Sequence, residues 1–241
     1  VNAQEVQVTV AGGMGETDRG GPAFNIIPKT GGNTFSGTAF FSTAGEWSQG
    51  SNLDDDLRRL GITEPPGLIK NYDTNLAVGG PIKRDRLWFY NNLRTYGTHQ
   101  DVPGLFANAN ALDPSKWSYV RDPNVQARSA GSKKIESIRL TGQLTPKNKL
   151  GFYYDYQANC AGSALVNTGD GCRERGDDWI ALGNTTTSPE SGNMWPEREK
   201  ITQATWTSPA TNRILIEAGF SSFSSKWGGY VPPGSQTGLV A

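Results

Sequence analysis

Residues that could bind metals or perform redox chemistry are scarce in this chain. Among its 241 residues are two cysteines and one histidine, too few for an ordinary zinc or thiol site. The 23 basic residues are balanced by 23 acidic residues, so the overall charge indicates neither nucleic acid nor an anionic surface as a partner. We therefore expect no metal, no cofactor and no nucleic acid.

Long apolar runs are missing as well. No stretch approaches the roughly 20 apolar residues that a transmembrane helix needs, which excludes helical membrane spans. A membrane β-barrel is not excluded, because only every second side chain of its strands contacts lipid and the average stays polar. A mean hydropathy of -0.53 is compatible with that pattern.

Catalytic constellations are also lacking. His99 is expected to be a solvated side chain at the outer end of a strand rather than a general base. The carboxylates at 54–56 and at 177–178 lack the alternating oxygen ligands of a calcium loop, so solvated charge explains them better. The glycines at 12–15 and 79–80 lack the lysine and helix of a phosphate-binding loop. We expect no enzymatic activity.

Period-two alternation is what the sequence has in abundance, and it predicts strands. Short polar turns at 83–86, 145–149 and 208–212 indicate three antiparallel hairpins. The expected class is all-β, an antiparallel meander with strands at 35–47, 72–82, 87–97, 134–144, 150–159, 200–207 and 213–227.

Long stretches at 48–71, 98–133 and 160–198 separate these strands and are expected to be loops, with a short helix within 51–62. Compact soluble domains rarely hold several structureless loops of about 20 residues. Outer-membrane barrels, in contrast, combine short turns at one end with long loops at the other. The alternation of short and long connections therefore favours a barrel.

The segment FNIIPKTGGNTFSGTAFF, residues 24–41, resembles the junction between plug and barrel in TonB-dependent outer-membrane transporters. The stretch NLAVGGPIKRDRLWFYNNL, residues 75–93, is similar to the second and third barrel strands of the Oar-like branch of that family. The positions that match the spacing of the junction motif are Asn25, Lys29, Gly31, Asn33, Phe35 and Gly37.

This resemblance implies two domains. Residues 1–33 would be the C-terminal end of a plug with strands at 5–10 and 23–29, and residues 34–241 the N-terminal part of the barrel. We expect positive φ angles at residues 31–33, where the chain turns out of the plug. Because about seven strands cannot close a barrel that uses 22, the chain is expected to be a fragment, with the TonB-contacting segment and further strands absent.

The resemblance also implies a function. It predicts location in the outer membrane of a Gram-negative-type bacterium and import of a large or scarce ligand, such as a glycan, an oligopeptide, another organic ligand or an iron chelate. The expected partners are the TonB complex, reached through the missing segment, outer-membrane lipid and an unidentified extracellular ligand. The alternative is a secreted β-rich carbohydrate-binding or adhesion protein.

Aromatic residues in the expected loops are candidate ligand contacts. Trp117, Trp179 and Trp195 could stack on a sugar or peptide, although local loop packing explains each of them equally well. In the same kind of loop, Cys160 and Cys172 are expected to form a disulfide rather than remain two free thiols. Such a loop of about 13 residues would gain on the order of 3 kcal/mol in the chain-entropy model.

The strand at 150–159 gives a prediction about orientation. Phe152 and Tyr154 have one parity, whereas Tyr153 and Asp155 have the other. An ionised Asp155 facing hydrocarbon would be costly, so in a membrane strand Phe152 and Tyr154 should face lipid and Asp155 the lumen or plug. Arginine at position 154 should then destabilise the protein more than arginine at position 153.

Overall fold

The computed structural model describes residues 3–10, 22–62, 64–110, 113, 115–164 and 195–226, which form two antiparallel sheets. The smaller sheet pairs β1 (Ala3–Thr9) with β2 (Ala23–Pro28). The larger sheet contains β3 (Ser36–Ala44), β4 (Leu68–Lys83), β5 (Leu87–Asn108), β6 (Arg121–Thr145), β7 (Asn148–Ala164), β8 (Trp195–Pro209) and β9 (Leu215–Lys226). The predicted all-β class is confirmed.

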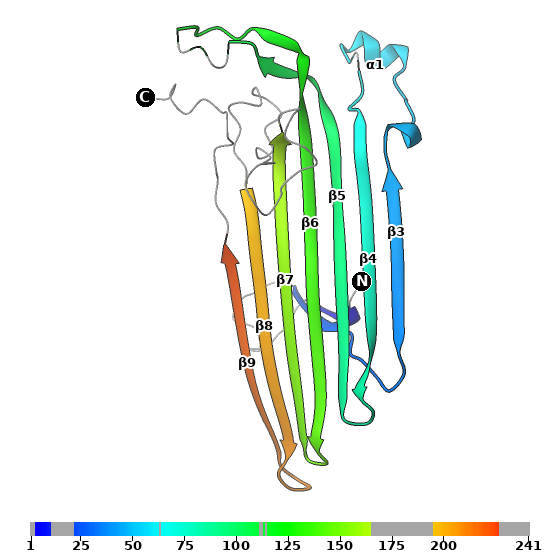
Figure 1. Ribbon diagram of the computed structural model, residues 1–241, viewed down its shortest axis with the longest axis vertical. Helices are drawn as coiled ribbons and strands as arrows, with labels where there is room; N and C mark the ends of the chain where they lie inside the picture. The colour runs from blue at the N-terminus through cyan, green and yellow to red at the C-terminus, as the bar shows by residue number, and fades with distance from the viewer. Residues whose placement is uncertain are drawn as a thin grey trace.

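The larger sheet is a simple meander, in which each strand pairs with the next one along the chain (Figure 1). The three predicted hairpins are confirmed: β4 pairs with β5, β6 with β7 and β8 with β9, all antiparallel. Tight polar turns explain these three pairings, because a short connection allows only an antiparallel neighbour. In the first turn Asp85 adopts a positive φ of 62°, a conformation that aspartate tolerates better than most residues.

The predicted loop at 98–133 is wrong. Strand β5 continues to Asn108 and β6 begins at Arg121, so most of this stretch belongs to the sheet. Pro103 and Gly104 in this stretch are residues typical of turns, but β5 accommodates them through a register shift between Asp101 and Phe106, with Gly104 at a φ of 72°. Such bulges bend a strand without ending it, and the tip of this hairpin bends sideways in Figure 1.

A short helix within 51–62 was expected, and α1 (Asp55–Arg59) lies there. The Asp54 side chain caps it by accepting a hydrogen bond from the Leu57 backbone N–H at 2.9 Å, and Asp56 pairs with Arg59. A single 3₁₀ turn, η1 (Glu46–Ser48), precedes it. Neither of these two helices in the described residues is long and apolar enough to cross a membrane.

The two faces of the large sheet differ sharply in chemistry. Following the register across the strands, one face, here called the apolar face, carries large hydrophobic side chains, many of them exposed. Its members include Phe35, Phe41, Leu76, Val78, Phe89, Leu93, Ile138, Leu140, Leu150, Phe152, Trp206 and Phe220.

The opposite face, here called the polar face, carries mainly hydrogen-bonding and charged side chains. Its members include Ser36, Thr38, Asp73, Asn75, Asn92, Arg94, Ser137, Arg139, Asp155, Gln157, Gln203 and Ser221. Apolar exceptions on this face are Phe40 and Phe223, which belong to the outermost strands, and Ile135 and Ile201, which belong to inner strands.

Burial is inverted relative to a water-soluble domain. Asn92, with 1% of its surface exposed, is the largest fully buried side chain among the described residues, whereas Phe152 is 39% exposed. In ordinary globular proteins asparagine is mostly exposed and phenylalanine is among the most buried residue types. The predicted orientation of β7 is confirmed to this extent: Phe152 and Tyr154 lie on the apolar face and Asp155, 5% exposed, on the polar face.

The small β1–β2 sheet lies against the polar face. Arg139 of β6 donates a hydrogen bond from Nη1 to the Pro28 carbonyl oxygen at 3.1 Å. A cavity of about 400 Å³ between the two sheets is lined by Gln4 and Lys29 on one side and by Thr38 and Tyr90 on the other. Figure 1 accordingly draws the short blue strands behind the large sheet.

Candidate functional site

The junction between the two sheets is the first candidate site, and Asn33 holds it in place. Its side-chain oxygen accepts hydrogen bonds from the Asp85 backbone N–H at 2.9 Å and from the Trp88 indole N–H at 2.7 Å. Its side-chain nitrogen donates to the Asp85 carboxylate. Asn33 therefore fixes the chain, just before β3, to the β4–β5 turn that lies 52 residues further along.

Aromatic packing continues this attachment. The rings of Phe35 and Phe89 meet edge to face with centroids 6.3 Å apart. The Phe35 ring also lies directly over Gly80, where any Cβ would overlap it. A Cβ at Gly37 would lie 2.7 Å from the Ala77 carbonyl oxygen, so Gly37 allows β3 to approach β4 closely.

The expectation of positive φ angles at residues 31–33 is wrong. In the described residues positive φ occurs at Gly61, Asp85 and Gly104. Gly31 is required for a different reason: a Cβ at this position would overlap the backbone carbonyl oxygen of Phe89, whereas Gly32 has open space around it. The glycine serves close approach of two backbones rather than a turn.

The structure describes fewer contacts for two other residues of the junction motif, Lys29 and Asn25. Lys29 is partly buried and lines the cavity between the sheets. Asn25 pairs with Gln7 through the β1–β2 register, and its side chain lies outside the described residues.

We expect Asn33→Ala to lower the free energy of unfolding by about 1–2 kcal/mol, because three partly solvated hydrogen bonds are lost. Asn212→Ala, an exposed position in the β8–β9 turn, should change it by less than about 0.5 kcal/mol. Denaturant titration in detergent measures both. Equal effects of the two substitutions would contradict the role of Asn33 in fixing the segment before β3 to the β4–β5 turn.

Hydrogen-bonded polar groups on the polar face form the second candidate site. Arg94 donates from Nε and Nη2 to the two carboxylate oxygens of Asp73, at 3.0 and 2.7 Å. Beside this pair, the Asn92 amide nitrogen donates to the Asn75 side-chain oxygen at 2.6 Å. Bidentate pairs of this kind fix side-chain geometry as well as supplying energy.

A further cluster on the polar face surrounds Asp155. Its carboxylate accepts hydrogen bonds from the Tyr153 hydroxyl at 3.1 Å and from the Gln157 amide at 2.8 Å. Arg139, which contacts the small sheet, is on the neighbouring strand, with its register partner Tyr153 directly opposite. These groups can hydrogen-bond a polar solute, water or a domain packed against the sheet.

Sequence patterns contained part of this signal. Asp73 and Asn75 alternate with apolar residues in 72–82, which indicates a polar face, but their partners on β5 depend on the register of the turn at 84–86. In the described residues, no group of three histidine, cysteine, aspartate or glutamate side chains is placed to hold a metal ion.

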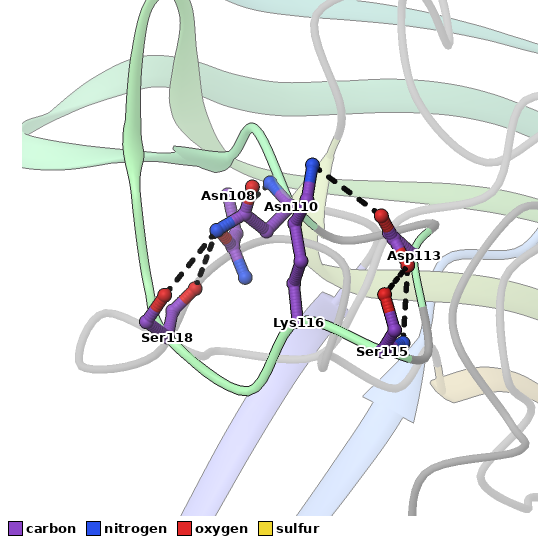
Figure 2. A network of polar contacts seen from close by, with 6 residues as sticks. All are labelled: Asn108, Asn110, Asp113, Ser115, Lys116 and Ser118. Atoms are coloured by element: carbon purple, nitrogen blue, oxygen red, sulfur yellow. Dashed lines mark hydrogen bonds and ion pairs between the residues drawn. The ribbon is translucent and has the colours of Figure 1, made fainter.

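The tip of the β5–β6 hairpin is the third candidate site, and polar contacts hold it together (Figure 2). Asn110 donates to the Ser118 carbonyl oxygen at 3.0 Å, and Lys116 pairs with Asp113 at 3.3 Å. Hydrogen bonds from the side chain and backbone of Ser115 lower the pKa of Asp113. The carboxylate therefore stays ionised, and able to pair with Lys116, at any ordinary pH.

Trp117 lies in this tip between Lys116 and Ser118 and is 84% exposed. Tyr119 is anchored by a hydrogen bond from its hydroxyl to the Phe106 carbonyl oxygen at 3.0 Å. The Trp117 indole is thus exposed rather than packed against its neighbours, and its contact with a ligand stays a prediction.

The expectation for His99 is wrong. This histidine is 5% exposed in β5, and its ring lies 6.4 Å from that of Tyr72 on the adjacent strand. Because the sheet extends past position 97, His99 is not at a strand end.

Several predictions lie outside the described residues. These are the Cys160–Cys172 disulfide, for which the Cys160 side chain and the whole of Cys172 are not described, together with Trp179, the carboxylates at 177–178 and the glycines at 12–15. Trp195 begins β8, where its backbone pairs with Ala161, but its side chain is not described.

No protein-family model, curated protein or solved structure matches the chain. Inference about its function therefore depends on the residues and the geometry described above.

Proposed function

We propose that this chain is part of a TonB-dependent outer-membrane transporter, with the large sheet forming one section of the barrel wall and the small sheet the end of a plug. The observation that carries the proposal is the inverted sheet. One face exposes phenylalanine, leucine and valine, while the other buries asparagine, aspartate and serine.

Hydrocarbon is the environment in which this inversion is stable. Exposed apolar patches as extensive as this face are rare on monomeric soluble proteins. On β6 the apolar stretch from Ile138 to Leu144 spans roughly 20 Å at about 3.3 Å per residue, and outer-membrane barrels carry an apolar band about 25 Å tall. Beyond this stretch, Glu136 and Lys134 follow on the same face.

The connections between strands differ in length at the two ends of the sheet, as they do in outer-membrane barrels. Turns at one end are short, whereas β6, with 25 residues, is about 80 Å long at that rise and far exceeds the apolar band. The extra length carries the β5–β6 tip away from the apolar region. In the proposal this extension projects outside the cell, and the short turns face the periplasm.

The edges of the sheet support a larger barrel. In the described part of the chain, β3 and β9 each pair with one neighbouring strand, and unpaired strand edges are costly in hydrocarbon. We propose that further strands join these edges to close the wall, as in plugged transporters with 22 strands.

Contacts between the two sheets support the assignment of a plug. The small sheet lies on the polar face, where Arg139 donates a hydrogen bond to Pro28, and Asn33 fixes the segment that links the two sheets to the β4–β5 turn. A domain inside a barrel would meet this face, because the lumen of such barrels is polar. In the proposal, Trp117 takes part in ligand capture, and the plug rearranges when the TonB complex acts on a segment outside this chain.

Cell fractionation tests the proposal. The protein produced from its complete reading frame should sediment with the outer membrane, resist alkaline extraction and require detergent for solubility, because its apolar face is in lipid. Chemical crosslinking in the same cells should connect it to TonB. Outer-membrane location without this crosslink would reduce the proposal to a passive barrel.

The alternative is a secreted carbohydrate-binding protein, which the exposed Trp117 also suits. In that case the protein would be recovered from the medium or a soluble fraction without detergent, and its apolar face would have to be covered by protein. Recovery in soluble form would overturn the membrane assignment.

A further inference from the structure

A groove crosses the apolar face near the short turns. It has a volume of about 550 Å³ and is lined almost entirely by apolar side chains from β5 to β9. Two rows of paired residues build it. Gly142, Leu150, Trp206 and Ala218 form one row, and Leu140, Phe152, Ala204 and Phe220 form the other.

Small residues explain why this part of the face is hollow. The residues at the bottom of the groove are small: Gly142, Ala204 and Ala218. Its sides are formed by the larger side chains of Leu150, Phe152 and Phe220. The result is a narrow apolar channel of a kind that suits a flexible hydrocarbon chain.

The turns at the end of this groove are rich in basic residues. The turns and their flanks at 83–86, 145–149 and 208–214 contain one acidic residue, Asp85, whose carboxylate accepts a hydrogen bond from Asn33. The same segments contain six exposed basic residues: Lys83, Arg84, Arg86, Lys147, Lys149 and Arg213. The opposite end of the sheet has mixed charge, with Asp54, Asp55 and Asp56 beside Arg58 and Arg59.

Arg86 and Lys147 belong to the turns that border the groove. The Arg86 carbonyl oxygen accepts a hydrogen bond from the Gln143 N–H at 2.7 Å, next to Gly142 in the groove. Lys147 precedes Asn148, whose side-chain oxygen accepts from the Trp206 indole N–H at 3.0 Å. The Trp206 ring thus has its polar edge at the turns and its apolar surface in the groove, as expected where hydrocarbon meets headgroups.

We propose that this groove binds an acyl chain of an anionic glycerophospholipid, with the phosphate held at the basic turns that contain Arg86 and Lys147. The inference rests on the proposed function, because it requires the apolar face to contact lipid. The inference goes beyond the proposed function because it assigns anionic phospholipid to the groove on the apolar face. Charge favours anionic lipid over a second copy of the chain as the occupant of the groove. A second copy would place six more basic residues beside the six in these turns, and like charges repel.

Quenching of Trp206 fluorescence tests the proposal. The protein is placed in nanodiscs of neutral phosphatidylcholine that contain the same low fraction of brominated phosphatidylglycerol or of brominated phosphatidylcholine. The signal of Trp206 is the difference between the protein and its Trp206→Phe variant. The control is the corresponding difference for Trp88→Phe, which gives the quenching of a tryptophan at the same depth on the polar face.

Brominated phosphatidylglycerol should quench Trp206 at a fraction where brominated phosphatidylcholine has little effect. Arg86→Gln/Lys147→Gln should weaken this preference about 25-fold, since each cation near a membrane surface contributes about fivefold to the binding of anionic lipid. Arg58→Gln/Lys134→Gln, both far from these turns, should leave it unchanged. If the double variant does not fold, raising the salt to ~1 M should remove the preference in the unmodified protein by screening.

Equal quenching by the two lipids would overturn the lipid site and leave the proposed function standing. Absence of quenching by either lipid would overturn both, because the apolar face would not contact lipid. Protection of Trp206 together with a doubled mass would assign the groove to a second copy and overturn the lipid proposal.

Discussion

Phe152→Arg should lower the free energy of unfolding of the protein in a bilayer by about 2–4 kcal/mol. Phe152 lies in the middle of the apolar stretch, in a row with Leu140, Ala204 and Phe220. An arginine there would place its charge in the hydrocarbon, where outer-membrane barrels lose about this much near the midplane and less toward the interfaces. Denaturant titration of the protein in lipid vesicles measures the change.

Gln203→Arg is the matched control, because Gln203 pairs with Tyr153 on the polar face of β8 and is exposed. Its expected effect is below about 0.5 kcal/mol, typical of solvated positions. The same contrast is expected for Tyr154, on the apolar face, although Tyr153→Arg would also lose the hydrogen bond to Asp155. A larger loss for Gln203→Arg than for Phe152→Arg would mean that the faces are reversed in the membrane.

Gly31→Ala should destabilise the protein by about 1–3 kcal/mol, the usual cost of adding atoms to a tightly packed site. The new methyl group would overlap the Phe89 carbonyl oxygen, so either the junction or β5 must move. Because the displaced group is backbone rather than a flexible side chain, we also expect faster proteolysis between β2 and β3. Unfolding titrations and limited proteolysis measure the two effects.

Gly32→Ala provides the control at the adjacent position. Nothing lies within 4 Å of the Cβ that it would add, and its φ is not positive. We expect it to be neutral or to stabilise the protein by about 0.4–1 kcal/mol, through the reduced entropy of the unfolded chain. If Gly31→Ala proved as harmless as Gly32→Ala, close approach to Phe89 would not be the reason for glycine at position 31.

Local patterns predicted much of the large sheet. The turns at 83–86, 145–149 and 208–212 gave the three hairpins correctly, because a tight polar turn leaves little choice of partner for the strands beside it. Alternation in 150–159 predicted that Phe152 and Asp155 lie on opposite faces, since the side-chain period of a strand is two. The short helix at 51–62 was also predicted, through its leucine spacing.

Features that depend on distant residues were missed or misread. The composition of the long stretch at 98–133, rich in glycine, serine and aspartate, predicts a loop, but pairing with β6 carries β5 through a bulge there. His99 is predicted to be solvated when β5 is expected to end near position 97. Its burial arises from the extension of β5 beyond that point. The local sequence does not predict the ion pair between Arg94 and Asp73, because the register of β4 and β5 brings the two side chains together.

Sequence by itself determined the three hairpins and the two chemically distinct faces, because each follows from a tight turn between neighbouring strands or from the period of the strand. Only the tertiary structure decided why Gly31 is a glycine and what Asn33 binds. It also decided that small residues on β6, β8 and β9 align into a groove beside the basic turns. These features arise from side-by-side placement of residues separated by tens of positions, which no local pattern encodes.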